Sequence, residues 1–273
     1  MSDPMRLSGR TAVITGAASG IGRAVARSLA KRGCHLALAD VNEAGLAETA
    51  RLVASAGLRV TEHRLDVADA DTIAGFPARI ADVHPGVDVL VNNAGVAVGG
   101  NFEQVSAADF EWLFDINFWG VVRMTRAFLP VLRASNDARL VNVSSVFGIV
   151  APPGQAAYAA SKFAVRGFSE SLRQELADST VGVTVVHPGG VATSISDSAR
   201  VPDGLTDEQI ARRRAAFKKH LKLPAEVAGE TIVRAIERRK PRVLVGNDAL
   251  ALAAVERVAP VGYWKVLGLA LRG

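Results

Sequence analysis

The sequence contains very little cysteine, and this scarcity limits the kinds of protein it can encode. The 273 residues include one cysteine, Cys34, so an internal disulfide framework is excluded. A lone thiol is typical of a reducing compartment, where it is usually a small buried apolar residue. Residues 1–8 contain Asp3 and Pro4 and lack the apolar run of a secretory signal. Together these features predict a cytoplasmic protein in which Cys34 has a structural role.

Long apolar segments, metal-ligand patterns and a strong charge bias are also missing. The longest apolar region, residues 249–271, is interrupted by Glu256, Arg257, Pro260 and Lys265, so it does not predict a membrane-spanning helix. The histidines show no metal-ligand spacing, and there is no Gly-Lys-Ser/Thr phosphate loop. With 32 basic and 27 acidic residues the formal charge is only +5, which does not indicate a nucleic-acid partner. No metal, ATP or nucleic-acid chemistry is expected.

Two segments of the second half have more than one interpretation. The basic segment 212–220 fits a solvated helix face, and the alternative is recognition of a phosphate-bearing substrate or an acidic surface. The C-terminal end is more apolar than a solvated terminus requires. Its apolar residues are Tyr263, Trp264, Val266, Leu267, Leu269 and Leu271. They predict contact with a partner subunit or a cover over the substrate entrance, with peripheral membrane attachment as the alternative.

Short β-branched runs alternate with helical patterns along the chain, which is typical of βαβ units and a parallel sheet covered on both faces. The expected strands are Thr11–Thr15, Leu36–Asp40, Arg59–Leu65, Val87–Val91, Leu140–Ser144, Val183–His187 and Arg242–Val245. We therefore expect an α/β fold with a doubly wound parallel sheet and three layers. One domain would span residues 1–273, with a substrate-loop region at 191–222 and a C-terminal extension at 247–273.

Three local signals predict where helices begin. Ser106 with Asp109 is a capping pattern for a helix running towards Arg133, and Thr206 with Gln209 is a second one. Pro224 suits the first turn of a further helix, because its missing N–H would have no partner there.

A glycine-rich turn follows the first expected strand and opens a helical pattern. It reads Thr-Gly-Ala-Ala-Ser-Gly-Ile-Gly over residues 15–22. Gly16 would permit the tight turn, Gly20 would let the backbone approach a pyrophosphate, and Gly22 would let helix and strand pack closely. Phosphates would then meet free N–H groups at the helix N-terminus. By itself the triplet is weak evidence, because a flexible turn has the same glycines.

The second expected strand ends in Asp40, where a carboxylate could accept hydrogen bonds from both adenosine ribose hydroxyls. The same carboxylate would repel a 2′-phosphate. Neither Ala18 nor Val41, the neighbouring positions where a cation could hold that phosphate, is Lys or Arg. This pattern favours NAD over NADP, although Asp40 could also cap the helix that begins near Asn42.

Tyr158 and Lys162 lie four positions apart in a helical pattern, so their side chains share a face. Free tyrosine has a pKa of about 10, and a neighbouring ammonium would favour phenolate and lower that pKa. The pair thus suits proton transfer, but Tyr-x-x-x-Lys is common on helix surfaces. What distinguishes it here is that Ser144-Ser145 and Asn92–Gly95 end two strands at the edge where a cofactor would lie.

Taken in order, these motifs resemble those of the short-chain dehydrogenase/reductase family. The chain matches T-G-x-x-x-G-x-G, N-N-A-G, S, Y-x-x-x-K and P-G from Leu7 to about Val245. The resemblance implies a Rossmann-type fold and a catalytic set of Asn117, Ser145, Tyr158 and Lys162. In that set Tyr158 is the general acid/base, Ser145 rather than Ser144 orients the substrate oxygen, Lys162 tunes Tyr158 and holds the nicotinamide ribose, and Asn117 completes a water-linked proton relay.

The resemblance also implies which residues border the cofactor and the substrate. The cofactor set is Gly16, Ser19, Gly20, Ile21, Gly22, Asp40, Asp66, Val67, Asn93, Ala94, Gly95, Tyr158, Lys162, Pro188, Gly189, Val191 and Thr193. The substrate candidates are Ser145, Phe147, Val150, Pro152, Tyr158 and Val191, and most of them are apolar. For any one apolar candidate, ordinary core packing is an equal alternative.

The expected function is therefore interconversion of a secondary alcohol and a ketone with NAD, by hydride transfer coupled to a proton on Tyr158. The alternatives are an NADPH-dependent ketoacyl reductase, an epimerase or dehydratase with a related Tyr/Lys pair, and an inactive nucleotide-sensing protein. The family resemblance and the apolar stretches 121–131 and 163–176 predict a homodimer or homotetramer.

Overall fold

The centre of the protein is a seven-stranded, fully parallel sheet with strand order β3-β2-β1-β4-β5-β6-β9. This computed structural model describes residues 3–202 and 204–265. The strands of the sheet are β1 (Thr11–Thr15), β2 (His35–Asp40), β3 (Val60–Arg64), β4 (Val89–Asn92), β5 (Ala138–Val143), β6 (Val181–Pro188) and β9 (Arg242–Val245). The order reverses direction between β1 and β4, so the carboxyl ends of these strands form the crevice where such sheets bind ligands.

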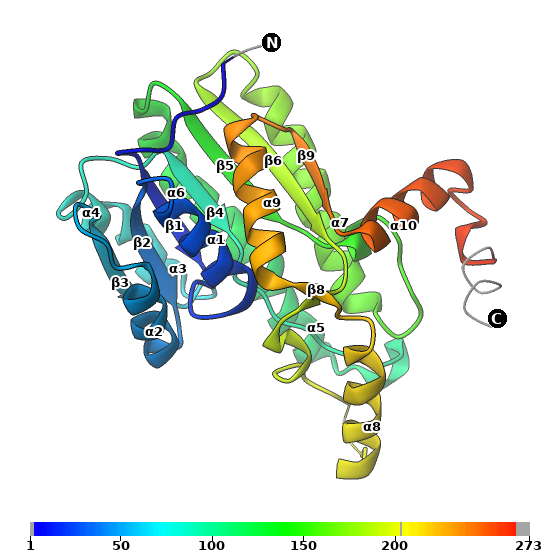
Figure 1. Ribbon diagram of the computed structural model, residues 1–273. Coiled ribbons are helices and arrows are strands. Elements are labelled where there is room, and N and C mark those ends of the chain that lie inside the picture. The colour runs from blue at the N-terminus through cyan, green and yellow to red at the C-terminus, as the bar shows by residue number, and fades with distance from the viewer. Residues whose placement is uncertain (1–2, 203, 266–273) are drawn as a thin grey trace.

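Helices cover both faces of the sheet (Figure 1). They are α1 (Gly20–Ala30), α2 (Glu43–Val53), α3 (Ala70–Ala74), α4 (Phe76–Ala81), α5 (Ala107–Phe114), α6 (Gly120–Ala134), α7 (Ala156–Glu175), α8 (Asp207–Lys218), α9 (Ala225–Glu237) and α10 (Asn247–Val258). The Rossmann-type, three-layer fold expected from the sequence is confirmed.

Two separate hydrophobic cores fix these layers. On one face α1, α2 and α9 bury apolar side chains against the sheet, for example Leu29, Leu46 and Ile232. On the other face α4, α6 and α7 do the same, with Phe76 and Phe128 packed edge to face. Because the central strands are buried on both sides, they are near-continuous apolar runs, as the sequence pattern predicted.

Most predicted boundaries agree with the structure to within two residues, and β1 and β9 have the predicted limits. Ser106 caps α5, and Thr206 with Gln209 forms a complete capping box for α8. Pro224 is the N-cap of α9 rather than its first residue. The single helix expected between Ser106 and Arg133 is instead α5 and α6 joined by a π-helical turn at Asp115–Trp119.

The substrate-loop region 191–222 contains more structure than the sequence indicated. Two short strands, β7 (Val191–Ala192) and β8 (Leu223–Pro224), pair with each other outside the main sheet. Arg200 attaches the loop to the preceding half of the chain through a bridge to Val98, an ion pair with Asp109 and a stack on Trp112. The helix α8 projects away from the sheet beyond this loop (Figure 1).

The C-terminal extension packs on the segment that follows β5. Helix α10 and Tyr263 share a small apolar cluster with Ile149 and Val150, and the Tyr263 hydroxyl accepts a hydrogen bond from the Ala151 N–H at 2.9 Å. The expected role as a cover over the substrate entrance stays a prediction. The expectation for Val266, Leu267, Leu269 and Leu271 falls outside the described residues.

Candidate active site

The glycine-rich turn after β1 has the backbone that its sequence predicts. Gly16 and Gly20 adopt φ values of +67° and +52°, which disfavour other residues. A Cβ at Gly22 would overlap the Gly16 carbonyl oxygen, so the third glycine lets α1 begin directly against the turn. Ser19 is the N-cap residue of α1 and Ile21 lies in its first turn, yet the Ser19 side chain makes no capping hydrogen bond. The turn therefore leaves backbone room for a phosphate at the start of an 11-residue helix.

Asp40 holds the end of β2 against this turn. One carboxylate oxygen accepts a hydrogen bond from the Ala18 N–H and the other from the Asn42 N–H, both at 3.0 Å. Asn42, rather than Asp40, caps α2, because its side chain accepts from the Gly45 N–H. The alternative role of Asp40 as the cap of α2 is therefore wrong. Its carboxylate is fixed at the carboxyl edge beside the glycine-rich turn.

The Asn-Asn-Ala-Gly segment after β4 locks the turn from the other side. The Asn93 amide donates to the carbonyl oxygens of Thr15 and Gly16 at 3.1 and 3.2 Å. The N–H groups of Asn93 and Ala94 both donate to the Thr15 hydroxyl. Sequence reasoning missed this role of Thr15, although a hydroxyl residue at the end of a buried strand was a visible signal. Gly95 lies next, where a Cβ would be 3.4 Å from Lys162 Nζ.

Asn117 lies in the π-helical turn and is fully buried. Its side-chain oxygen accepts from the Val96 N–H at 2.8 Å, and its amide donates to the Val96 carbonyl and to Ser161 Oγ at 3.0 and 3.2 Å. The side chain thus holds the backbone that follows Gly95. The relay role stays a prediction, and the contacts made by Asn117 are those of a positioning residue.

Ser144 and Ser145 make different hydrogen bonds, and the catalytic role expected for Ser145 stays a prediction. Ser144 Oγ donates to the Lys162 carbonyl and anchors β5 to α7. Ser145 lies in an extended conformation at the end of β5, and its Oγ accepts from the Phe147 N–H at 3.1 Å. A side-chain hydrogen bond from Ser145 lowers the pKa of the Tyr158 phenol, which indicates that the two hydroxyls lie close together. Ser145 is therefore the serine that faces the tyrosine.

Tyr158 and Lys162 meet on one face of α7. Lys162 Nζ lies 5.7 Å from the centre of the Tyr158 ring and donates to the Val143 carbonyl at 3.2 Å. Burial lowers the pKa of the Lys162 ammonium to about 8. Burial also raises the pKa of Tyr158, and the Ser145 hydrogen bond opposes this rise.

One expectation about this pair needs correction. The sequence predicted that the Lys162 charge would lower the pKa of Tyr158, but in the protein alone desolvation dominates and the pKa of Tyr158 is raised. The physical reason is position: the ammonium lies over the ring and is bound to the backbone of β5, while the phenol is removed from water. In the protein alone, burial therefore favours the neutral phenol form of Tyr158.

The remaining cofactor candidates differ in how far they are buried at the carboxyl edge of the sheet. Val67 is buried against Gly120, whereas Asp66 is exposed and its carboxylate accepts from the Ala68 N–H. Thr193 lies over Gly20, where a Cβ would be 3.0 Å from its methyl group. Pro188 ends β6, and Gly189 donates its N–H to the Val245 carbonyl.

The apolar substrate candidates separate into two groups. Phe147 and Pro152 are partly exposed, and the Phe147 ring contacts the Tyr158 ring edge to face at 6.2 Å. Val150 and Val191 are 1% and 4% exposed and pack in apolar clusters. The two valine side chains therefore belong to the packed core, as the alternative interpretation expected. Phe147 is the substrate candidate that lies beside Tyr158.

A cleft of about 850 Å³ opens beside Ser19 and Gly20, and sequence reasoning missed it. Its lining includes Arg23 and Arg27 from α1 and Lys218 and Lys222 from the end of α8 and the loop after it, with Asp197 and Glu226 as the acids. The cations come from segments far apart in the sequence, so no local motif announced them. Their net positive charge lies where a pyrophosphate would meet the start of α1.

Within 3–202 and 204–265, no group of three or more His, Cys, Asp or Glu side chains could hold a metal ion. In the same ranges no helix is both long and apolar enough to cross a bilayer.

Known proteins share this architecture. A family model for short chain dehydrogenases matches residues 10–203. A Mycobacterium tuberculosis protein named as the oxidoreductase SadH is 43% identical over 262 residues, covering 95% of this chain and 94% of that protein. A Burkholderia phymatum short-chain dehydrogenase/reductase, solved in complex with NAD, superposes with a TM-score of 0.84 at 33% identity and covers 93% of this chain and 94% of its own. A Streptomyces avermitilis short-chain dehydrogenase gives 0.82 at 28% identity, over 98% and 99%.

Proposed function

The chain belongs to the short-chain dehydrogenase/reductase family of oxidoreductases, and we propose that it interconverts a secondary alcohol and a ketone with NAD. The observation that carries the proposal is the convergence of Ser145, Tyr158 and Lys162 beside Gly95 and the glycine-rich turn. A protein that only sensed a nucleotide would need the turn but not this trio.

The described residues fit a dinucleotide. Gly16, Gly20 and Gly22 leave a cradle that side chains would fill. The adjoining cleft has four basic and two acidic side chains, and its two ion pairs leave Arg23 and Lys222 as the excess positive charge. Asp40 is held where it could accept from the adenosine ribose hydroxyls, and it would repel a 2′-phosphate. These features support NAD over NADP. A related protein was solved with NAD bound, which is consistent with the same choice.

The chemistry divides between the cofactor and the protein. When bound, NAD supplies a carbon that accepts a hydride from the carbinol carbon. Ser145 Oγ donates a hydrogen bond to the substrate oxygen, and Tyr158 takes the proton of the substrate hydroxyl. In the reverse direction Tyr158 returns that proton to the carbonyl oxygen of the ketone. Lys162 holds a positive charge beside the tyrosine, and Asn117 keeps the Gly95-Val96 backbone in place.

The proposed substrate is largely apolar near its reacting carbon. Phe147 lies against the Tyr158 ring, and Tyr263 fixes the backbone at Ala151. A second candidate is a reductase of carrier-linked ketones, which the cationic cleft would favour because such carriers bear phosphate. Asp40 argues against the NADPH that this second activity generally uses.

We also propose that the protein acts in the cytoplasm as a homodimer or homotetramer. Trp119 and Phe163 are 49% and 39% exposed, and Trp119 packs on Phe118 beside the aromatic side chains of α5 and α7. An exposed aromatic surface of this kind suits a second copy of the chain. Light scattering at micromolar concentration that gave only monomer would contradict the assembly.

The test is a panel of secondary alcohols and ketones, including carrier-linked ketones, each assayed with NAD and with NADP by absorbance of the reduced cofactor. Turnover with NAD on alcohols or simple ketones is expected, with at least about tenfold weaker binding of NADP. An Asp40→Ala variant should reduce the preference for NAD over NADP, while Glu62→Ala serves as an exposed acidic control outside the cofactor set. Equal or tighter binding of NADP would contradict the role of Asp40.

A further inference from the structure

His187 is a buried histidine beside the catalytic serine that the proposed mechanism does not use. It lies in β6 immediately before Pro188, and its side chain has no exposed surface. Its ring nitrogen Nδ1 lies 2.9 Å from the Ser145 carbonyl oxygen. A carbonyl can only accept a hydrogen bond, so Nδ1 carries the hydrogen and His187 is the donor.

The ring is neutral under ordinary conditions, so it acts as a fixed donor. Burial lowers the pKa of His187 to about 4, and the positive charges of Arg242 and Arg166 act in the same direction. With Nδ1 protonated, Nε2 is an acceptor, and it has no hydrogen-bond partner among the described residues. An unpaired buried acceptor is unfavourable by about 1–3 kcal/mol. An apolar side chain would pack in this place without that penalty.

The contact is directed at the residue that matters for substrate orientation. The Ser145 carbonyl accepts from both His187 and the Gly148 N–H at 2.9 Å, while Ser145 Oγ accepts from the Phe147 N–H. The backbone carbonyl and the side-chain oxygen of Ser145 thus each accept a hydrogen bond that holds the residue in place. The His187 donor comes from β6, the neighbouring strand in the sheet.

We propose that His187 is a positioning residue for the reaction: its Nδ1–H fixes the Ser145 carbonyl and so aims the Ser145 hydroxyl at the substrate oxygen. This inference rests on the proposed role of Ser145. His187 does not touch the reacting atoms, so its effect passes through the serine. It belongs to the carboxyl end of β6 and explains why a histidine precedes Pro188-Gly189.

Two substitutions distinguish the hydrogen bond donated by His187 Nδ1 from the packing of the His187 ring. His187→Leu keeps an apolar side chain in the space and removes the donor, and the Ser145 carbonyl retains the Gly148 N–H, so the variant should fold. His187→Asn places an amide N–H near the position of Nδ1. We expect His187→Leu to lower kcat by about 10- to 100-fold with unchanged NAD affinity, and His187→Asn to restore most of that loss.

A double-mutant cycle with Ser145→Ala is the closing experiment, with single-turnover rates, NAD affinity and thermal unfolding measured for each variant. If His187 acts through the serine, His187→Leu causes no further loss in the Ser145→Ala background. The proposal is overturned if His187→Leu alone keeps normal kcat, or if it lowers the rate by the same factor in both backgrounds. Normal turnover of Ser145→Ala by itself would overturn the proposed role of the serine, which is a separate result.

Discussion

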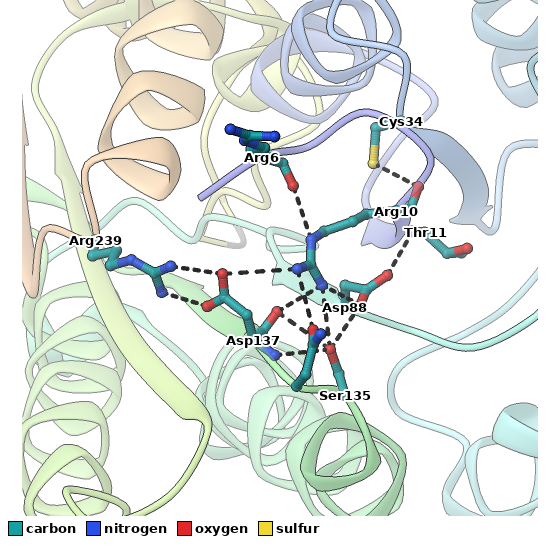
Figure 2. Close-up of polar contacts among 9 residues, drawn as sticks. Arg6, Arg10, Thr11, Cys34, Asp88, Ser135, Asp137 and Arg239 are labelled. Carbon is teal, nitrogen blue, oxygen red and sulfur yellow. Dashed lines mark hydrogen bonds and ion pairs between the residues drawn. The ribbon is translucent and has the colours of Figure 1, made fainter. Parts of the chain in front are cut away.

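The two edges of the central sheet carry very different polar groups. At the amino edge, Arg10 and Asp88 precede β1 and β4, and Asp137 and Arg239 precede β5 and β9; these four residues form one connected ion-pair network (Figure 2). Arg10 Nη1 lies 2.7 Å from Asp88 Oδ1, and Arg239 donates to the two Asp137 carboxylate oxygens through Nη1 and Nη2. Within this network each charge has an opposite charge beside it, whereas the buried Arg139 of β5 leaves its Nε without a hydrogen-bond partner among the described residues.

The carboxyl edge has buried groups that lack such partners. Burial lowers the pKa of Lys162 to about 8, and no carboxylate opposes this shift. Burial also raises the pKa of Tyr158. His187 keeps an unpaired ring nitrogen. The amino edge thus holds a network of paired charges, whereas the carboxyl edge gathers buried groups without an opposite charge around the candidate active site.

Cys34 illustrates the contrast at the amino edge. Its thiol is fully buried and donates to the Arg10 carbonyl, and burial raises its pKa to about 12. A thiol with so high a pKa is inert at neutral pH. The structural role expected from the sequence is consistent with these contacts.

The largest expected effect is the loss of turnover in Tyr158→Phe. The change keeps the ring that packs on Phe147 and removes only the hydroxyl that transfers the proton. Turnover should fall by about 10²- to 10⁴-fold, while NAD affinity and the unfolding temperature stay near those of the wild type. Steady-state kinetics with calorimetric NAD binding measures both. Near-normal turnover of this folded variant would show that another group moves the proton.

At the amino edge, Asp137→Ala should lower stability and leave turnover unchanged. It leaves Arg10 and Arg239 without a shared carboxylate, and the Asp137 side chain is only 17% exposed. We expect the free energy of unfolding to fall by about 2–3 kcal/mol while kcat is unchanged. Urea unfolding measures the first quantity.

The exposed pair Glu48 and Arg51 provides the matched control for that prediction. Glu48→Ala breaks an ion pair between side chains that are 42% and 71% exposed, so solvent screens the interaction and the midpoint of urea unfolding should stay near that of the wild type. If Asp137→Ala were as mild as this control, or if it reduced kcat strongly, the division between the edges would be wrong.

The dependence of the free energy of unfolding on pH, measured below neutrality, tests whether His187 is buried in its neutral form. The pKa of His187 is about 4 in the folded protein, below the value near 6.5 of an exposed histidine. The unfolded chain therefore binds an extra proton between these values, so stability is fully present above pH 6.5 and falls as pH falls towards 4. His187→Asn should flatten this slope by on the order of 1.4 kcal/mol per pH unit.

The smallest effect is expected for Tyr263→Phe. It removes the hydroxyl that accepts from the Ala151 N–H and keeps the ring in its apolar cluster. KM for bulky substrates should rise by about two- to fivefold, with NAD affinity unchanged. A shift in NAD affinity without a change in KM would place the effect of the C-terminal extension at the cofactor instead of the substrate entrance.

Much of the fold could be predicted from the sequence, because apolar periodicity determines which segments are strands and helices. β1 and β9 have the predicted limits, and Ser106 and Thr206 cap helices as expected. The π-helical turn around Asn117 was not predictable, since its residues are compatible with an ordinary helix. The β7–β8 ladder was also missed, because two-residue strands have no periodicity.

The site was predictable where a motif is local and not where contacts join distant segments. Asp40 and the glycine-rich turn were found from their positions relative to strands. The Gly190 N–H donates a hydrogen bond to the Asp248 carboxylate at 2.6 Å, and these residues are 58 positions apart. No local sequence pattern predicts such a contact. The raised pKa of Tyr158 could not be predicted either, because it depends on how completely the folded protein removes the phenol from water.

The most direct test of the contrast between the edges is one variant, Lys162→Met, measured for stability and for turnover at pH 7. Methionine keeps the length and volume of the lysine stem and removes a charge that burial disfavours. We predict that the free energy of unfolding rises by about 1–2 kcal/mol, after the loss of the hydrogen bond to Val143 is allowed for, while turnover falls by at least about 100-fold. A variant that loses stability, or one that keeps its turnover, would contradict the account.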